Sequence, residues 1–276
     1  APVIRYLAAL ACLVIVSFLI SLIDRHPLRL FYLHRQSAYN FTRLHALRDS
    51  APAPLFFSRS HCPHCKHKLN GIDLIPLLSY LCLKGHCRYC QTKISFQYCL
   101  IECIGALLSC MVVARYGLSL HSLLLLGLGY TLIVLAAIDL SHQLLPDTLT
   151  LSLITAGLIL NTQSLWVTPT LAITGAVLGY ALPKGINFIY QCCRKQHGMG
   201  QGDFKLLAAT GAWFGSTIML NIWISATLLA TLIEGTRYCL NRSSKPSVCA
   251  FGPYLVVATF LSATYGPFLY RLIQIQ

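Results

Sequence analysis

Apolar runs of about 20 residues recur along this chain, and they restrict its fold more than any other feature. A helix of that length crosses the hydrocarbon core of a bilayer, so a series of such runs predicts several membrane-spanning helices. Only 11% of the residues are charged, whereas a soluble domain carries about 25%. We therefore expect an all-α polytopic membrane protein, with a break near Gly215 because 204–236 is too long for one helix. The eight predicted transmembrane helices are 4–23, 98–115, 120–140, 148–166, 169–190, 204–215, 217–236 and 251–272.

The positive charge of the chain lies mainly in three segments between the predicted spans. The formal net charge is +13, and the three segments are 24–97, 190–205 and 237–250. With an external N-terminus all three fall on the cytoplasmic side, which is the positive-inside pattern of membrane proteins. This distribution favours a membrane orientation, so we expect the lipid bilayer as a partner and no nucleic acid. We also expect the first helix to be retained, because no clear small-residue cleavage site follows it.

Two CxxC pairs lie in residues 24–97, the one large segment outside the predicted spans. Two such pairs suit tetrahedral zinc, and a segment of this size needs a metal or a disulfide to support its small core. Disulfides and metal-free thiols are the alternatives, and the predicted cytoplasmic position argues against disulfides. A mixed site with His61, His64, His67 or His86 also stays open. We expect a small cytoplasmic zinc-binding domain, with structural zinc held by Cys62, Cys65, Cys87 and Cys90.

Five of the eight acidic residues lie at the cytoplasmic ends of predicted spans: Glu102, Asp139, Asp147, Asp203 and Glu234. Asp147 follows Leu-Pro at the start of a span, which predicts a helix N-cap. Asp139 lies at a helix C-terminus, where the macrodipole disfavours a negative charge, so it needs a partner or a function. Asp203 follows Gly200-Gln201-Gly202, more glycine than a cap requires. Two aspartates at one membrane depth on separate helices predict an aspartyl protease pair, because close carboxyl groups share a proton. The glycines would let an extended substrate approach the backbone.

Five stretches carry a family resemblance over most of the chain: SRSHCPHC, IPLLSYLCLKGHCRYCQTKIS, AAIDLSHQLLPDTLTL, GMGQGDFKLLAATGAW and AFGPYL. In these stretches the chain resembles the bacterial prepilin peptidases, or type 4 prepilin leader peptidases. The resemblance implies that Asp139 and Asp203 are the catalytic dyad and that Asp147 is a neighbour. We expect Gly200, Gly202, Lys205 and Asp147 to bind the substrate.

The resemblance also implies the reaction. Members of this family cleave the basic leader from type IV prepilins and type II secretion pseudopilins at the cytoplasmic face of the inner membrane. Those with the four-cysteine domain then methylate the new N-terminal residue from S-adenosylmethionine. The implied domains are a first transmembrane helix (1–23), the zinc-binding domain (24–97) and a membrane-embedded peptidase domain (98–276).

Two departures from the family pattern bear on methylation more than on proteolysis. The chain has Val16-Ser17-Phe18-Leu19-Ile20 where the family usually reads G-S-F-x-N, and Cys99 where proline is usual. A peptidase without methyl transfer is therefore one alternative, and a non-catalytic zinc-stapled membrane scaffold is another. A proton-coupled transporter is a third, but it would carry its acidic residues near the middle of the bilayer.

Overall fold

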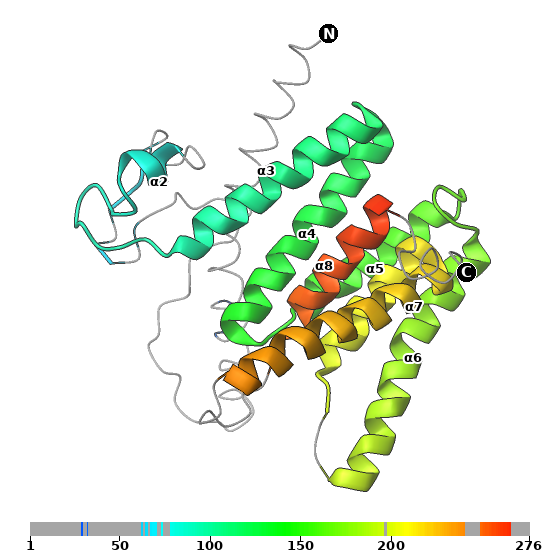
Figure 1. The fold of residues 1–276 in the computed structure, drawn as a ribbon. Helices are drawn as coiled ribbons and strands as arrows, with labels where there is room; N and C mark the ends of the chain where they lie inside the picture. The colour runs from blue at the N-terminus through cyan, green and yellow to red at the C-terminus, as the bar shows by residue number, and fades with distance from the viewer. Residues whose placement is uncertain are drawn as a thin grey trace, which may run out of the picture. The chain divides into compact units, whose positions relative to one another are not determined.

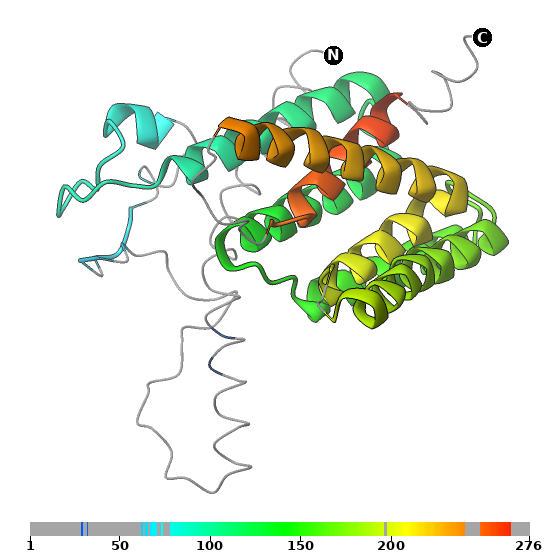
Figure 2. The same ribbon diagram turned by 60° about the horizontal axis from the view of Figure 1, so that its bottom comes forward.

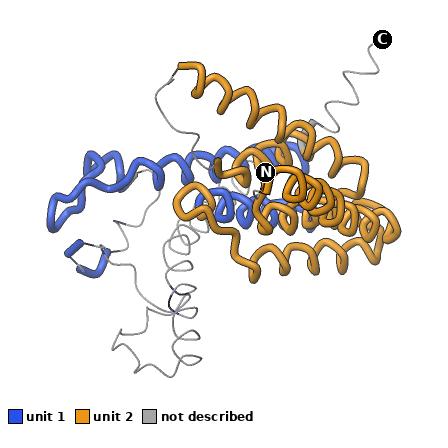
Figure 3. Tube along the Cα trace, turned by 90° about the horizontal axis from the view of Figure 1, so that it is seen from below, with its two compact units in different colours: residues 1–137 blue, residues 138–276 orange. Residues whose placement is uncertain are grey.

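The computed structural model describes residues 29, 32, 62, 64–65, 67–70, 73, 78–195, 198–240 and 249–265. The predicted first span, 4–23, lies outside these described residues, as does His61. Figure 1 shows that the described part is mainly helical, and its described β-structure is limited to isolated bridge residues, among them an antiparallel bridge between His86 and Lys93. The chain divides into two compact units, Ala1–Ala137 and Ile138–Gln276, which are described separately (Figure 3).

The first unit contains α2 (Leu78–Cys82), α3 (Phe96–Tyr116) and most of α4 (Leu120–His142). α3 begins after Ser95, whose hydroxyl accepts a hydrogen bond from the Gln97 amide, and it ends at Gly117, where φ is 66°. A buried hydrogen bond of 2.6 Å joins Ser109 of α3 to the Tyr130 hydroxyl of α4. Ser109 also donates to the Gly105 carbonyl of its own helix at 2.6 Å. Polar side chains of this kind form hydrogen bonds between apolar helices in lipid.

The second unit contains the end of α4, α5 (Asp147–Asn161), α6 (Pro169–Arg194), α7 (Gln201–Leu240) and α8 (Gly252–Tyr265). α7 lies against α5, α6 and α8 (Figures 1 and 2). Glycines bring α6 and α7 together: a Cβ on Gly175 would lie 2.5 Å from the Gly211 carbonyl oxygen, and one on Gly179 would lie 2.7 Å from that of Leu207. Small residues thus let the two backbones touch, as in other membrane helix pairs.

α7 breaks at Gly215, which confirms the break predicted from the sequence. Gly215 has φ 81° and ψ 172°, so the helix turns there, and the two halves take different directions in Figure 2. The carbonyls of Ala212 and Trp213 belong to the turn just before this break. Both accept hydrogen bonds from the side-chain amide of Asn161 on α5, at 2.8 and 3.1 Å. Asn161 therefore satisfies the helix end that Gly215 creates.

The all-helical class is confirmed, whereas the number of eight spans is not. Within the described ranges, α3, α4 and α7 are long and apolar enough to cross a membrane, and α5 and α8 are shorter apolar helices. α5 has 15 residues, which at 1.5 Å per residue is about 22 Å, less than the hydrocarbon thickness of about 30 Å. α6 has 26 residues but carries Pro183 and Lys184 within its length.

Candidate active site and metal centre

Asp139 lies in the last turn of α4 and is buried, with 6% of its surface exposed. Its carboxyl oxygen Oδ2 accepts a hydrogen bond of 2.9 Å from the backbone amide of Gly252, the first residue of α8. The first amides of a helix have no intrahelical partner and carry the positive end of its dipole. The start of α8 therefore supplies the partner that a carboxyl group at the end of α4 requires.

Gly252 is the residue of this site that the sequence analysis did not single out. A Cβ on Gly252 would lie 2.7 Å from Asp139 Oδ2, so the backbone reaches the carboxyl only because no side chain intervenes. The signal in the sequence was the AFGPYL stretch, in which a proline in the first turn of α8 follows the glycine.

Asp203 lies in the first turn of α7 and is also buried, with 9% of its surface exposed. The backbone amide of Gly200 hydrogen-bonds to its carboxyl, and a Cβ on Gly200 would lie 3.3 Å from Oδ2. The carboxyl groups of Asp139 and Asp203 interact electrostatically across the space between α4 and α7. The structure thus brings together two buried carboxyl groups from separate helices, each bonded to a glycine amide.

The space beside Gly202 is filled by Leu145, from the loop between α4 and α5. A Cβ on Gly202 would lie 2.7 Å from the Leu145 Cβ. The sequence analysis gave this glycine the task of admitting an extended substrate. In the structure the glycine first makes room for Leu145, so a substrate strand here would have to displace that side chain.

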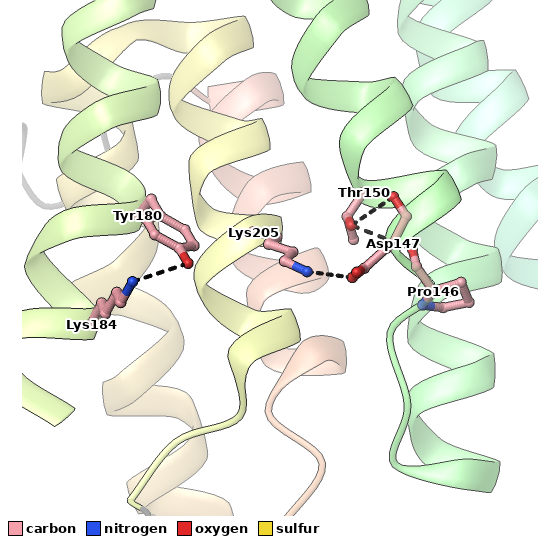
Figure 4. A network of polar contacts seen from close by, with 6 residues as sticks. All are labelled: Pro146, Asp147, Thr150, Tyr180, Lys184 and Lys205. Carbon is pink, nitrogen blue, oxygen red and sulfur yellow. Dashed lines mark hydrogen bonds and ion pairs between the residues drawn. The ribbon is translucent and has the colours of Figure 1, made fainter. Parts of the chain in front are cut away.

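Asp147 pairs with Lys205, as Figure 4 shows, and this corrects the predicted capping role. The Lys205 Nζ lies 2.6 Å from Asp147 Oδ1, whereas the N-cap residue of α5 is Pro146 and no side chain caps this helix start. Proline takes the position because its fixed backbone angle suits a helix entry. Residues two apart on a helix point about 200° apart, so Lys205 leaves α7 away from Asp203. The pair therefore ties α5 to α7 beside the two carboxyl groups.

Three further contacts hold the elements around the carboxyl groups. Tyr254, two residues after Gly252, donates a hydrogen bond of 2.8 Å to Glu234 near the end of α7. Tyr180 of α6 packs edge-on against Phe204, and Lys184 reaches the Tyr180 hydroxyl at 3.5 Å (Figure 4). These contacts fix the starts of α8 and α7, from which the site is built.

The first unit holds a four-cysteine cluster, made of Cys62, Cys65, Cys87 and Cys90. Their sulfur atoms all lie within 4.8 Å of one another, and those of Cys62 and Cys90 are 3.8 Å apart. Bonds of about 2.3 Å to a tetrahedral zinc ion would set sulfurs about 3.8 Å apart. All described cysteines are free thiols, so the cluster is not a pair of disulfides. The donor set and its spacing fit a metal ion.

Each half of the cluster is built on a tight backbone turn. The amide of Cys62 donates to the His67 carbonyl at 3.0 Å, and the amide of Cys87 donates to the Thr92 carbonyl at 2.9 Å. The described histidines lie outside the sulfur cluster: His86 bonds to the Lys84 carbonyl, and the His67 ring stacks on Tyr89 at 3.7 Å. The structure therefore favours the all-cysteine site over the mixed site.

The thiols of the cluster differ in acidity. The Thr92 hydroxyl, 3.1 Å from the Cys90 sulfur, together with the Thr92 backbone, lowers the pKa of Cys90 to about 6. The His67 backbone lowers the pKa of Cys65, but burial and the neighbouring thiols of Cys62 and Cys90 outweigh it and raise this pKa to about 11. A metal ion that binds four such groups displaces their protons, so its affinity depends on pH.

The fold and the two sites are those of a helical membrane protein with a carboxyl pair suited to acid–base hydrolysis. Residues 10–116 match the bacterial peptidase A24 N-terminal domain, and residues 126–235 match the type IV leader peptidase family. The chain is 34% identical over 254 residues to a prepilin leader peptidase/N-methyltransferase of Stutzerimonas stutzeri, covering 92% of this chain and 88% of the relative. It is 34% identical over 264 residues to a prepilin leader peptidase/N-methyltransferase of Pseudomonas putida, covering 96% of this chain and 91% of the relative. It is 37% identical over 223 residues to one of Aeromonas hydrophila, covering 81% of this chain and 77% of the relative. No solved structure matches the chain. The chain belongs to the type IV leader peptidase family.

Proposed function

We propose that this protein is a membrane aspartyl endopeptidase that removes the basic leader from type IV prepilins and type II secretion pseudopilins, and that it then N-methylates the new N-terminal residue. The observation that carries the peptidase is the buried, interacting pair of Asp139 and Asp203, each held by a glycine amide. Family membership supports the same reaction, because the relatives are named prepilin leader peptidase/N-methyltransferase.

The two carboxyl groups perform the hydrolysis as a pair. Repulsion between like charges keeps both from ionising together, so they hold one proton between them. The ionised carboxyl takes a proton from water, and the water oxygen attacks the scissile carbonyl carbon. The other carboxyl gives its proton to the carbonyl oxygen. Collapse of the tetrahedral intermediate breaks the C–N bond: the proton taken from water passes to the leaving nitrogen, and the hydroxyl formed from the carbonyl oxygen returns its proton to the second carboxylate.

The proposed substrate-binding residues act on two sides of α7. Gly200 and Gly202 flank the entry to Asp203, and an extended chain that displaced the Leu145 side chain from Gly202 would approach the backbone there. Lys205 and Asp147 act from the other side, where their ion pair holds α5 against α7. We assign the glycines to the approach of the substrate and the ion pair to the shape of its binding site.

The four cysteines would hold zinc, which supplies structural support to the segment around them. Four protein ligands leave no open position for water, so the residues fit a structural site and not a catalytic one. For the methyl donor we propose S-adenosylmethionine, as the resemblance implies. The described residues offer no strand followed by a glycine-rich loop, so we assign no residue to the donor.

The proposed location is the bacterial inner membrane, with several spans and the carboxyl pair facing the cytoplasm. The segments 24–97, 190–205 and 237–250 carry the positive charge that sets this orientation. The proposed domains are 1–23 for the first helix, 24–97 for the zinc-binding domain and 98–276 for the peptidase domain.

The direct test is a reaction of the purified protein in lipid with a prepilin and S-adenosylmethionine. Mass spectrometry of the product should show the loss of the leader and the added mass of one methyl group. A product that is cleaved but not methylated would limit the chain to proteolysis. An uncleaved prepilin under conditions in which a related peptidase cleaves it would contradict the proposal.

A further inference from the structure

Asn187 of α6 holds the turn that precedes Asp203. Its side-chain oxygen Oδ1 accepts two backbone hydrogen bonds, from the amide of Gly198 at 3.0 Å and from the amide of Met199 at 3.1 Å. Asn187 is buried, with 9% of its surface exposed. One buried oxygen thus anchors two consecutive amides that lie outside any helix.

The turn also fits closely against α6. A Cβ on Gly198 would lie 3.0 Å from the Tyr190 ring and 3.3 Å from Asn187 Oδ1. A side chain at residue 198 would therefore require the Tyr190 ring, the Asn187 side chain or the turn itself to move by a few tenths of an ångström. Gly198 and Asn187 both allow the turn to lie close to α6.

The anchored turn leads directly to the proposed catalytic carboxyl. Gly200 follows Met199 in the chain, and its backbone amide hydrogen-bonds to Asp203. A shift of the turn would carry Gly200 with it and alter the orientation of that carboxyl. Contacts between α6 and α7 at Gly175 and Gly179 lie farther along the two helices and do not reach this turn.

We infer that Asn187 is a positioning residue, which sets the orientation of Asp203 through the turn at Gly198 and Met199. The inference rests on the proposed function, because Asp203 acts there as one of the proton-transferring pair. A leucine at residue 187 would leave two amides without their acceptor, and the turn would move to find another. An aspartate would keep an acceptor oxygen in the same place.

The test compares variants of the purified full-length chain in lipid, with a prepilin as substrate. Asn187→Leu should lower kcat by about tenfold to a hundredfold, the range expected for a small misplacement of a catalytic group, while KM changes much less. Asn187→Asp should restore most of kcat. Hydrogen exchange of the peptide that contains Gly198 and Met199 should be faster in Asn187→Leu than in the wild type or in Asn187→Asp.

Asn221→Leu is the matched control, because the Asn221 side chain donates to the Thr217 carbonyl of its own helix and, among the described residues, bonds to no other element. It should keep wild-type kcat. Where Asn187→Leu does not fold, Asn187→Ala removes the oxygen without added bulk and carries the same expectation. Wild-type kcat in Asn187→Leu or Asn187→Ala, a change in KM alone in these two variants, or no recovery of kcat with Asn187→Asp would each overturn the inference. Full activity of Asp203→Asn would instead refute the proposed function.

Discussion

At the scale of single residues, the site depends on how buried carboxyl groups are held. Asp139 and Asp203 are both buried, and each accepts a hydrogen bond from a glycine amide. Asp147, in contrast, has 60% of its side chain exposed and forms an ion pair with Lys205. A buried carboxyl that retains its proton-transfer role needs such an oriented donor, because the surrounding hydrocarbon offers none. On these grounds we propose Asp139 and Asp203 as the pair for the chemistry and Asp147 as a residue that holds α5 against α7.

We predict that Asp139→Asn and Asp203→Asn each abolish leader cleavage while the protein stays folded. Asparagine keeps an oxygen that accepts the glycine hydrogen bond but cannot exchange a proton. Loss of a general acid or base lowers the rate by about 10²- to 10⁴-fold. Rates of prepilin cleavage, measured beside thermal unfolding, check both effects.

Asp147→Asn is the comparison for this pair. It breaks a half-exposed ion pair with Lys205, and such pairs contribute about 0–1 kcal/mol to stability. We expect its cleavage rate to stay far above that of the other two variants. Near-normal cleavage by either dyad variant, or loss of cleavage only in Asp147→Asn, would contradict the assignment.

The backbone contact at Gly252 gives a second prediction. In Gly252→Ala the new Cβ would lie 2.7 Å from Asp139 Oδ2, so the carboxyl or the start of α8 must shift. We expect kcat to fall by about tenfold to a hundredfold. Gly235→Ala on α7 is the control, since a Cβ there meets nothing within 4 Å. Equal kcat in the two variants would show that Gly252 does not set the position of Asp139.

At the residue scale the sequence predicted the two carboxyl groups but not all their partners. Asp139 stood out because a helix C-terminus disfavours it, and Asp203 stood out because of the glycines before it. The partner of Asp139 lies 113 residues further along the chain, and no local pattern indicates a contact of that range. The contact of Leu145 with Gly202 was unpredictable for the same reason, because Leu145 reaches this glycine from another element.

At the scale of elements, the break in α7 was predictable and its support was not. A glycine in the middle of an overlong apolar run indicated the break at Gly215. The side-chain amide that bonds to the carbonyls of Ala212 and Trp213 comes from Asn161, at the end of a different helix. The side-chain oxygen of Asn161 also accepts hydrogen bonds from the amides of Trp166 and Val167. One asparagine thus joins the end of α5, the loop after it and the break in α7.

We predict that Asn161→Leu destabilises the second unit. The substitution leaves the carbonyls of Ala212 and Trp213 and two loop amides without their partner, and one buried unpaired group costs about 1–3 kcal/mol. The midpoint of thermal unfolding in detergent should fall clearly, whereas Asn221→Leu should leave it nearly unchanged. An unaltered midpoint in Asn161→Leu would show that water or lipid replaces these hydrogen bonds.

At the scale of the whole molecule, composition predicted the class but helix length limited the number of spans. The predicted helix 98–115 is found as Phe96–Tyr116, and 120–140 is found as Leu120–His142. α5 is shorter than its predicted range because it ends at Asn161, whose side chain serves the neighbouring helix. Hydropathy alone could not predict a helix end that is set by a hydrogen bond to another helix.

The last prediction concerns the proposed zinc ion: the four cysteines that would bind it lie in the first unit, while both proposed catalytic residues lie in the second. Protein purified without chelator should contain about one zinc ion per chain, as four thiolates from two CxxC pairs bind one ion. Cys87→Ser removes a buried ligand and should lose the zinc, and because metal binding supplies folding energy, the segment around it should become sensitive to protease. Cys82→Ser is the control, since Cys82 is an exposed thiol outside the cluster.

Leader cleavage should survive in Cys87→Ser, because the carboxyl pair and its glycine amides belong to the other unit. Elemental analysis without zinc in the wild type, or equal zinc loss in Cys82→Ser, would refute the site, and complete loss of cleavage in Cys87→Ser would refute the independence of the two units.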